Sequence, residues 1–274
     1  MKIKEAVDWG TKQLKYSSSP RLDAEVLLSF ASQKPKTDLY ARPFAIIPTL
    51  RTKKYKALIK ERAASVPIAY LTKQKEFFNI TFYVDHHVLI PRPETEAIVK
   101  NAIELARKKK IKIIYDIGTG CGNIAIALAK NLPSAKIVAS DICRQALSVA
   151  KRNILNQGLE NQIEIVHSNL AEHIKTAELI VANLPYIPEY YRVSKDILFE
   201  PQKALFAGMD GLKFYRRLFK ETFPRLFRGT VLIELGTKQY EPMSNWLIQH
   251  FSNVQTTPIN NIDGSICGLK ANFS

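Results

Sequence analysis

From residue 95 onward, short apolar runs alternate with segments of helical periodicity. The helical segments cover 95–107, 123–131 and 144–156, and the apolar runs lie at 111–115, 135–139, 163–166, 179–182 and 230–235. Apolar strands that alternate with helices are typical of a mostly parallel, doubly wound α/β sheet with helices on both faces. Ligands of such sheets bind at the carboxyl ends of the strands, so the residues that follow each run are the candidates for a site.

The first 72 residues show helical periodicity and no β-rich stretch. Apolar residues repeat at helical spacing over 6–14, 22–31 and 55–64, and prolines separate these segments. We expect residues 1–72 to form a small N-terminal helical bundle. The aromatic and β-branched residues that follow predict a β-hairpin linker over 73–90, and the α/β domain is expected over 91–274.

The hairpin is expected to turn at Asp85-His86-His87. Two adjacent histidines beside an aspartate raise the alternative of a metal site. Neighbouring side chains of a strand point to opposite faces, however, and no cluster of further ligands accompanies them in the sequence. We therefore expect a turn and no metal.

The bulk properties indicate a cytoplasmic protein. No apolar stretch approaches the roughly 18 residues of a membrane span, and the amino terminus lacks the apolar core of a secretory signal. Cys121, Cys143 and Cys267 form no paired motif, which is typical of a reducing compartment. The formal net charge is +15, and residues 1–75 carry sixteen basic and six acidic side chains. This excess indicates an acidic partner or a phosphate backbone, although a lysine-rich surface that only aids solubility has the same composition.

A glycine-rich loop follows the first strand of the α/β domain. Its sequence is Asp116-Ile117-Gly118-Thr119-Gly120-Cys121-Gly122-Asn123. Its three glycines let the backbone turn sharply and approach a ligand closely. The spacing differs from the GxGxxG dinucleotide fingerprint, and an acidic residue before the loop suits an ammonium group better than a pyrophosphate. The pattern therefore indicates S-adenosylmethionine, whose methionine part carries an ammonium group.

The ends of the next two strands supply the rest of the expected cofactor site. Asp141 can accept both ribose hydroxyls, Ile142 can pack on adenine, and Asn169 with Leu170 can face the adenine amine and ring. Each polar residue alone also suits the cap of the following helix. Their order on consecutive strand ends favours one site. We expect it to comprise Asp116, Gly118, Thr119, Gly120, Cys121, Gly122, Asp141, Ile142, Asn169, Leu170 and Asn183.

The tetrapeptide Asn183-Leu184-Pro185-Tyr186 follows the buried run at 179–182. The Asn183 side-chain oxygen and a nearby backbone carbonyl can each accept one hydrogen of a planar NH2 group. Tyr186 can stack on that group, and Pro185 restricts the backbone around it. The alternative is an ordinary turn, since Asn and Pro are common turn residues. Together with the cofactor loop, the tetrapeptide indicates methyl transfer to an amide or amine nitrogen, with Asn183, Pro185 and Tyr186 as catalytic residues.

Two further segments carry a resemblance to a known family. Val88-Leu89-Ile90-Pro91-Arg92-Pro93-Glu94-Thr95-Glu96 and the segment from Glu200 to Leu212 resemble the glutamine methyltransferases of peptide-chain release factors. With the two motifs above, the resemblance runs from about Pro67 to Leu235. It implies a class I, Rossmann-like methyltransferase fold. It further implies that S-adenosylmethionine methylates the side-chain nitrogen of the glutamine in the GGQ motif of class 1 release factors. The substrate would then lie against Arg92, Glu94, Asn183, Leu184, Pro185 and Tyr186.

The chain departs from the family pattern in three places. Leu184 replaces the first proline of Asn-Pro-Pro-Tyr, and Asn169 stands where an acidic residue is common. The tail at 261–267 also lacks the arginine that often follows the Asp-x-x-Gly turn of the family. Asn-Leu-Pro-Tyr also occurs in adenine dimethyltransferases of ribosomal RNA, so an adenine N(6)-methyltransferase of RNA or DNA is the main alternative. A catalytically silent, basic RNA-associated module is the third. The capping of the following helix is an alternative role for Glu94 and Glu96.

Overall fold

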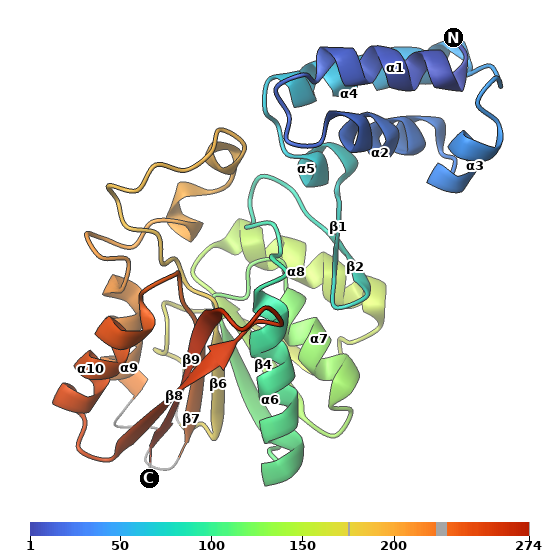
Figure 1. Cartoon of the computed structure of the whole chain (residues 1–274). Helices are drawn as coiled ribbons and strands as arrows, with labels where there is room; N and C mark the ends of the chain where they lie inside the picture. The colour runs from blue at the N-terminus through green and yellow to red at the C-terminus, as the bar shows by residue number, and fades with distance from the viewer. Residues whose placement is uncertain (175, 223–228, 274) are drawn as a thin grey trace. The chain divides into compact units, whose positions relative to one another are not determined.

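The computed structural model describes every residue except 175, 223–228 and 274 (Figure 1). The chain divides into two compact units, each with its own core. One unit comprises residues 1–74 and 193–199, and the other comprises residues 75–192 and 200–274. Among the described residues, no helix combines the length and the apolar character that a bilayer crossing requires.

The first unit is helical, as the periodicity predicted. Its helices are α1 (Ile3–Gln13), α2 (Pro20–Ser32), α3 (Lys36–Ala41), α4 (Thr49–Ala63) and α5 (Ile68–Thr72). Pro20 is the first residue of α2, a position where its missing N–H leaves no helical bond unmade. Tyr55 of α4 is fully buried, and its hydroxyl donates to the Ala6 carbonyl of α1 at 3.1 Å.

A two-stranded hairpin begins the path into the second unit. Its strands are β1 (Gln74–Phe77) and β2 (Ile80–Tyr83). Phe78 and Asn79 both have positive φ, 51° and 58°, as a two-residue hairpin turn of the primed type requires. The prediction that the hairpin turns at Asp85–His87 was therefore wrong. Its turn lies at Phe78-Asn79, and residues 88–90, which were expected to form its second strand, form no strand.

A seven-stranded sheet forms the second unit. Its strands are β3 (Ile113–Ile117), β4 (Lys136–Asp141), β5 (Ile163–His167), β6 (Leu179–Ala182), β7 (Thr230–Glu234), β8 (Val254–Asn260) and β9 (Ile266–Phe273). They lie in the order β5-β4-β3-β6-β7-β9-β8, and only β9 runs antiparallel to its two neighbours. The predicted mostly parallel sheet is confirmed. The β8–β9 pair was not predicted, because β8 is largely polar and exposed.

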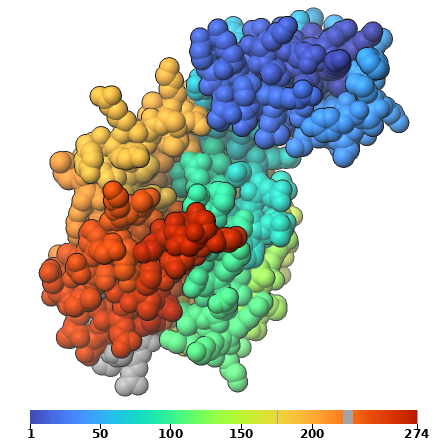
Figure 2. Space-filling view, in the orientation of Figure 1, coloured from blue at the N-terminus to red at the C-terminus, as the bar shows by residue number. Residues whose placement is uncertain are grey.

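Helices cover both faces of this sheet. They are α6 (Thr95–Lys109), α7 (Asn123–Asn131), α8 (Arg144–Gln157), α9 (Lys213–Thr222) and α10 (Tyr240–His250). Ile117, Ile180 and Ile233 share one core cluster with α9 and α10. The alternate strand residues face the other side, where α6 contacts β6 and β7 and α7 contacts β4 and β5. The β8–β9 hairpin lies beside α6, as the red and green surfaces in Figure 2 show.

The strand order creates the position of the site. The chain crosses from β3 to β4 on one side and returns to β6 on the other, so β3 lies at the switch point where open α/β sheets bind ligands. Ile117 pairs with Ala182 at the carboxyl ends of β3 and β6. The glycine loop after β3 and the Asn183 tetrapeptide after β6 therefore lie side by side. A Cβ atom on Gly118 would come within 2.8 Å of Leu184 Cδ2.

Candidate active site

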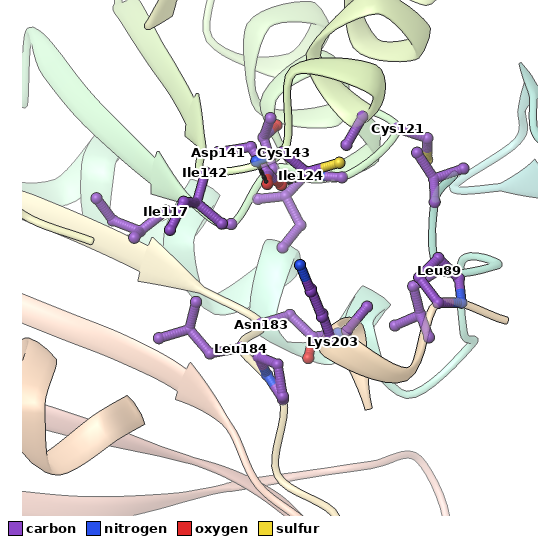
Figure 3. Close-up of a pocket in the computed structure, with 18 of the residues that line it drawn as sticks. Leu89, Ile117, Cys121, Ile124, Asp141, Ile142, Cys143, Asn183, Leu184 and Lys203 are labelled. Carbon is purple, nitrogen blue, oxygen red and sulfur yellow. Dashed lines mark hydrogen bonds between the residues drawn. The ribbon is translucent and has the colours of Figure 1, made fainter. Parts of the chain in front are cut away.

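A cavity of about 510 Å³ opens at the carboxyl ends of β3, β4 and β6 (Figure 3). Its volume lies in the range of small-molecule sites, and its walls are mostly apolar. The structure brings most of the predicted site residues into this one lining. They are Arg92, Gly118, Thr119, Gly120, Cys121, Asp141, Ile142, Asn169, Leu170, Asn183, Leu184 and Pro185.

Asp116 lies beneath the glycine loop, outside the lining. It belongs to β3, because the strand runs two residues further than the predicted 111–115. Its Oδ2 accepts the Thr119 hydroxyl at 2.6 Å and the Ala125 N–H of α7 at 3.1 Å. Its Oδ1 is buried and has no partner among the described residues. Burial raises the pKa of Asp116 to about 7, although the two hydrogen bonds act in the opposite direction.

Asp141 connects the glycine loop after β3 to the segment between β4 and α8. Its Oδ2 accepts the Gly120 N–H at 3.0 Å and its Oδ1 accepts the Cys143 N–H at 2.8 Å. Burial raises its pKa even so. A carboxylate has about four acceptor positions, so two remain for hydroxyl groups of a ligand. The adjacent Ile142 is an apolar side chain that is 63% exposed in the cavity wall, as an aromatic ring system would require.

The Asn169 amide has a defined orientation. Its Nδ2 donates to Glu172 Oε1 at 3.0 Å, so its Oδ1 is the atom left for a donor on a ligand. Leu170 beside it adopts a left-handed conformation with φ 49°. Gly122 forms the left-handed N-cap of α7 and does not line the cavity.

A chain of hydrogen bonds holds Asn183. Its Nδ2 donates to Thr95 Oγ1 at 3.1 Å, and the Thr95 hydroxyl donates to Glu234 Oε2 at 2.5 Å. The other carboxylate oxygen, Glu234 Oε1, accepts the Tyr186 hydroxyl at 3.1 Å. Burial raises the pKa of Glu234 to about 7, against the bonds from Thr95 and Tyr186. Burial, and then the Glu234 carboxylate, raises the pKa of Tyr186 far above its usual range. Tyr186 does not line the cavity, and its side chain is connected to that of Asn183 through the Glu234 and Thr95 hydrogen bonds.

The leucine that replaces the usual proline has a partner for its extra N–H. Tyr215 of α9 is fully buried, and its hydroxyl accepts the Leu184 N–H at 3.0 Å. The same hydroxyl donates to the Leu184 carbonyl at 3.2 Å. Both polar groups of the Leu184 backbone are thus held by one phenol.

The segment at 88–96 is tied to the segment at 200–204. Glu200 is buried, accepts the Ile90 N–H at 2.9 Å and forms an ion pair with Arg92. Both segments line the cavity, and Figure 3 shows the Lys203 side chain extended into it. Glu94 occupies the N-cap position of α6 without a side-chain capping bond and does not line the cavity. Glu96 instead accepts the Phe78 N–H of the hairpin at 2.9 Å.

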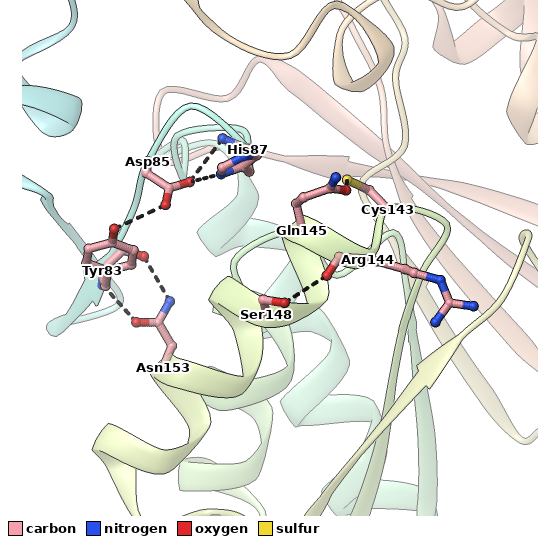
Figure 4. Close-up of polar contacts among 8 residues, drawn as sticks. All are labelled: Tyr83, Asp85, His87, Cys143, Arg144, Gln145, Ser148 and Asn153. Atoms are coloured by element: carbon pink, nitrogen blue, oxygen red, sulfur yellow. Dashed lines mark hydrogen bonds and ion pairs between the residues drawn. The ribbon is translucent and has the colours of Figure 1, made fainter.

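The hairpin is fastened to the same site through Tyr83 and Asn153 (Figure 4). Asn153 bonds both backbone groups of Tyr83 and also donates to the Cys121 carbonyl at 2.9 Å. Asp85, His86 and His87 place potential ligand atoms within 4.8 Å of one another. The Asp85 carboxylate, however, already accepts the His87 backbone N–H, the His87 ring and the Tyr83 hydroxyl. These bonds stabilise a turn at residues 86–87.

Sequence reasoning missed Thr95, Glu200, Glu234 and Tyr215. Three of them are polar groups that are almost completely buried, and Tyr215 is a buried phenol. Strand periodicity could have indicated that Glu234 is buried, since it lies two positions from Leu232 and therefore on the same face of the strand. The others reach the site only through contacts between segments 31 to 139 residues apart, which no local pattern reveals.

The chain is similar to known proteins over most of its length. Two family models match, the PrmC N-terminal domain over residues 5–72 and the methyltransferase small domain over residues 96–208. A release factor glutamine methyltransferase of Buchnera aphidicola is 34% identical over 262 residues, covering 93% of this chain and 94% of that protein. One of Shewanella oneidensis is 36% identical over 261 residues, covering 93% and 91%. The chain belongs to the release factor glutamine methyltransferase family.

Solved structures confirm the fold expected of a release factor glutamine methyltransferase. The catalytic domain of hMettl16, solved with a hairpin of the MAT2A 3′UTR, matches with a TM-score of 0.59 and 19% identity, covering 77% of this chain and 81% of that one. Ribosomal protein L11 methylase of Lactobacillus delbrueckii matches with a TM-score of 0.51 and 20% identity, covering 70% and 84%. At such identities the likeness establishes the methyltransferase fold alone.

Proposed function

We propose that the chain transfers a methyl group from S-adenosylmethionine to the side-chain nitrogen of the glutamine in the GGQ motif of class 1 release factors. The observation that carries the proposal is the Asn183 amide, held by Thr95 at the edge of a cavity that the glycine loop and Asp141 also line. The relatives over almost the whole chain bear the corresponding name.

The cavity suits the proposed cofactor. The buried Asp116 Oδ1 without a partner places an acceptor oxygen beneath the loop, which favours a donor such as the ammonium group of a methionine moiety. Asp141 keeps acceptor positions for ribose hydroxyls, while Ile142 and Asn169 offer an apolar wall and an amide acceptor. Bound there, S-adenosylmethionine supplies a methyl group activated by a sulfonium.

The protein's part in the reaction is to orient a poor nucleophile. An amide nitrogen is weak because its lone pair is delocalised into the carbonyl. In the proposed arrangement, Asn183 Oδ1 and the Leu184 carbonyl accept its two hydrogens, which draws electron density to nitrogen and stabilises the developing positive charge. Tyr186 does not line the cavity, but its hydroxyl is fixed by Glu234, and we propose that its ring flanks the amide when the substrate is bound. We identify no dedicated general base among these groups and propose that the proton leaves to solvent after transfer.

Transfer of a labelled methyl group tests the substrate class. The protein is incubated with labelled S-adenosylmethionine and, separately, with a class 1 release factor, the same factor with Gln→Ala in its GGQ motif, RNA and DNA. We expect label in the unaltered factor only. Label found only in nucleic acid would favour the adenine alternative. That alternative is supported by the Asn-Leu-Pro-Tyr sequence and the basic N-terminal residues alone.

Asp141→Ala is expected to raise the dissociation constant of S-adenosylmethionine at least about tenfold, because a ribose acceptor and the Gly120 and Cys143 contacts are lost together. Calorimetric titration measures it. Asp263→Ala is the control, since that aspartate serves an exposed turn through Ser265. Equal affinity in Asp141→Ala would contradict the assigned cofactor position, and a wild-type protein without measurable binding would support a silent module.

A further inference from the structure

The Asn183 amide can lie in two ways, and only one suits the proposed reaction. An amide carries an acceptor oxygen on one side and a donor NH2 on the other. The substrate nitrogen also carries hydrogens, so it needs the oxygen. If the amide were reversed, two NH2 groups would face each other. The proposed reaction therefore requires a neighbouring group that fixes the orientation of the Asn183 amide.

The hydrogen-bond chain makes that selection. A threonine hydroxyl has one proton, and the Thr95 proton goes to Glu234 Oε2 at 2.5 Å. Thr95 Oγ1 can then only accept, so the group that faces it at 3.1 Å must be the Asn183 NH2. The Asn183 Oδ1 is left on the other side and has no partner among the described residues. The hydrogen bonds thus all point in one direction: Asn183 donates to Thr95, and Thr95 donates to the Glu234 carboxylate.

We propose that Glu234 is a positioning residue which, through Thr95, holds Oδ1 of Asn183 available to the substrate nitrogen. The inference rests on the proposed function, in which Oδ1 accepts an N–H of glutamine. Glu234 itself is buried and does not line the cavity. Its second oxygen holds the Tyr186 hydroxyl at 3.1 Å, so one carboxylate orients two residues of the tetrapeptide.

Protonation of Glu234 would reverse the direction of these hydrogen bonds. A neutral carboxyl can donate to Thr95, which then donates its own proton to the Asn183 oxygen and turns the amide round. Burial, with a smaller contribution from Glu94, raises the pKa of Glu234 to about 7 against the lowering effects of Thr95, Tyr186 and Asn183. The carboxylate is also close enough to raise the pKa values of the Tyr215 and Cys267 side chains. Turnover at saturating cofactor should therefore fall as the pH drops through neutrality.

Thr95 variants test the chain of donors with little change of shape. Thr95→Val keeps the volume and removes the hydroxyl, and we expect kcat to fall at least about tenfold. Thr95→Ser restores the hydroxyl, and we expect kcat within about threefold of wild type. Wild-type turnover in Thr95→Val, or an equal loss in Thr95→Ser, would overturn the proposal.

Glu234→Gln tests the carboxylate. Its amide cannot accept from both Thr95 and Tyr186, so kcat should fall by about tenfold or more and lose its decline below neutrality. Glu25→Gln is the matched control, because Glu25 is a buried carboxylate of the helical unit that accepts the Tyr40 hydroxyl and pairs with Arg21. It should lose stability and keep the pH profile. A Glu234→Gln enzyme that retains the wild-type decline would overturn the proposal.

A measurement without substrate separates this inference from the proposed function. Side-chain amide resonances of Asn183, assigned by NMR, should shift as wild type is titrated through neutrality. The shift should be much smaller in Thr95→Val, where only the direct effect of Glu234 on the amide remains. An identical titration in both proteins, or none in wild type, would overturn the inference whatever the substrate is. If wild type methylates no release factor and the titration is still as expected, the proposed function fails and the positioning role stands.

Discussion

Asn183→Ala is expected to lower kcat for release-factor methylation by about a hundredfold, the usual effect of removing one preorganised polar group at the reacting centre. The structure presents the Asn183 amide already oriented by Thr95, so the lost interaction is one that needs no reorganisation during reaction. Cofactor affinity should change by less than about threefold, since Asp141 and the glycine loop remain. Steady-state kinetics at saturating S-adenosylmethionine, with calorimetry for the cofactor, measures both quantities.

Asn101→Ala provides the control for that substitution. Asn101 lies within α6, its amide donates to the Ala97 carbonyl at 3.0 Å, and it does not line the cavity. Its kcat should equal that of wild type. An Asn183→Ala enzyme that turns over like Asn101→Ala would show that Asn183 does not orient the substrate.

Tyr215→Phe is expected to lower the free energy of unfolding by about 1–3 kcal/mol, the cost of a buried polar group that has lost its partner. The Leu184 N–H has the Tyr215 hydroxyl as its acceptor at 3.0 Å, and the Leu184 carbonyl loses its donor as well. Turnover should fall together with stability, because the Leu184 carbonyl is proposed to accept a hydrogen of the substrate amide. Urea unfolding and kcat are the measurements.

A second substitution separates this cause from simple loss of packing. Leu184→Pro removes the N–H that needs an acceptor, so it should restore part of the stability lost in Tyr215→Phe. The packing of Leu184 against Gly118 is lost in both backgrounds and cancels in the double-mutant cycle. Tyr55→Phe, which removes another fully buried tyrosine hydroxyl, should lose stability without any rescue by Leu184→Pro. Strict additivity of Leu184→Pro and Tyr215→Phe would contradict the assigned role of the hydroxyl.

Local patterns predicted well the glycine loop and the helix that follows it. The helix 123–131 was predicted with the bounds that the structure has, because an apolar segment of helical periodicity directly follows the glycine loop. The same loop–helix junction places Gly118, Thr119 and Gly120 in the cavity lining. These features depend on residues close in sequence, which is why the sequence predicts them.

Long-range contacts explain what the sequence did not predict. Thr95 and Glu234 are 139 residues apart and meet only because β6 and β7 pair beneath α6. Strand β3 was placed two residues too early, since Asp116 looks like a loop residue until its buried bonds to Thr119 and Ala125 are known. Leu184 was noted as a departure from the family, but its hydrogen bond to Tyr215 required the packing of α9.

Tandem mass spectrometry of the GGQ peptide tests the central claim most directly. A class 1 release factor is incubated with the protein and S-adenosylmethionine, digested, and the modified residue located by fragmentation. We predict one added methyl group on the side-chain nitrogen of the glutamine, and none with the Asn183→Ala enzyme beyond a trace. A methyl group on any other residue, or an unmodified GGQ peptide beside methylated adenine in added RNA, would contradict the account.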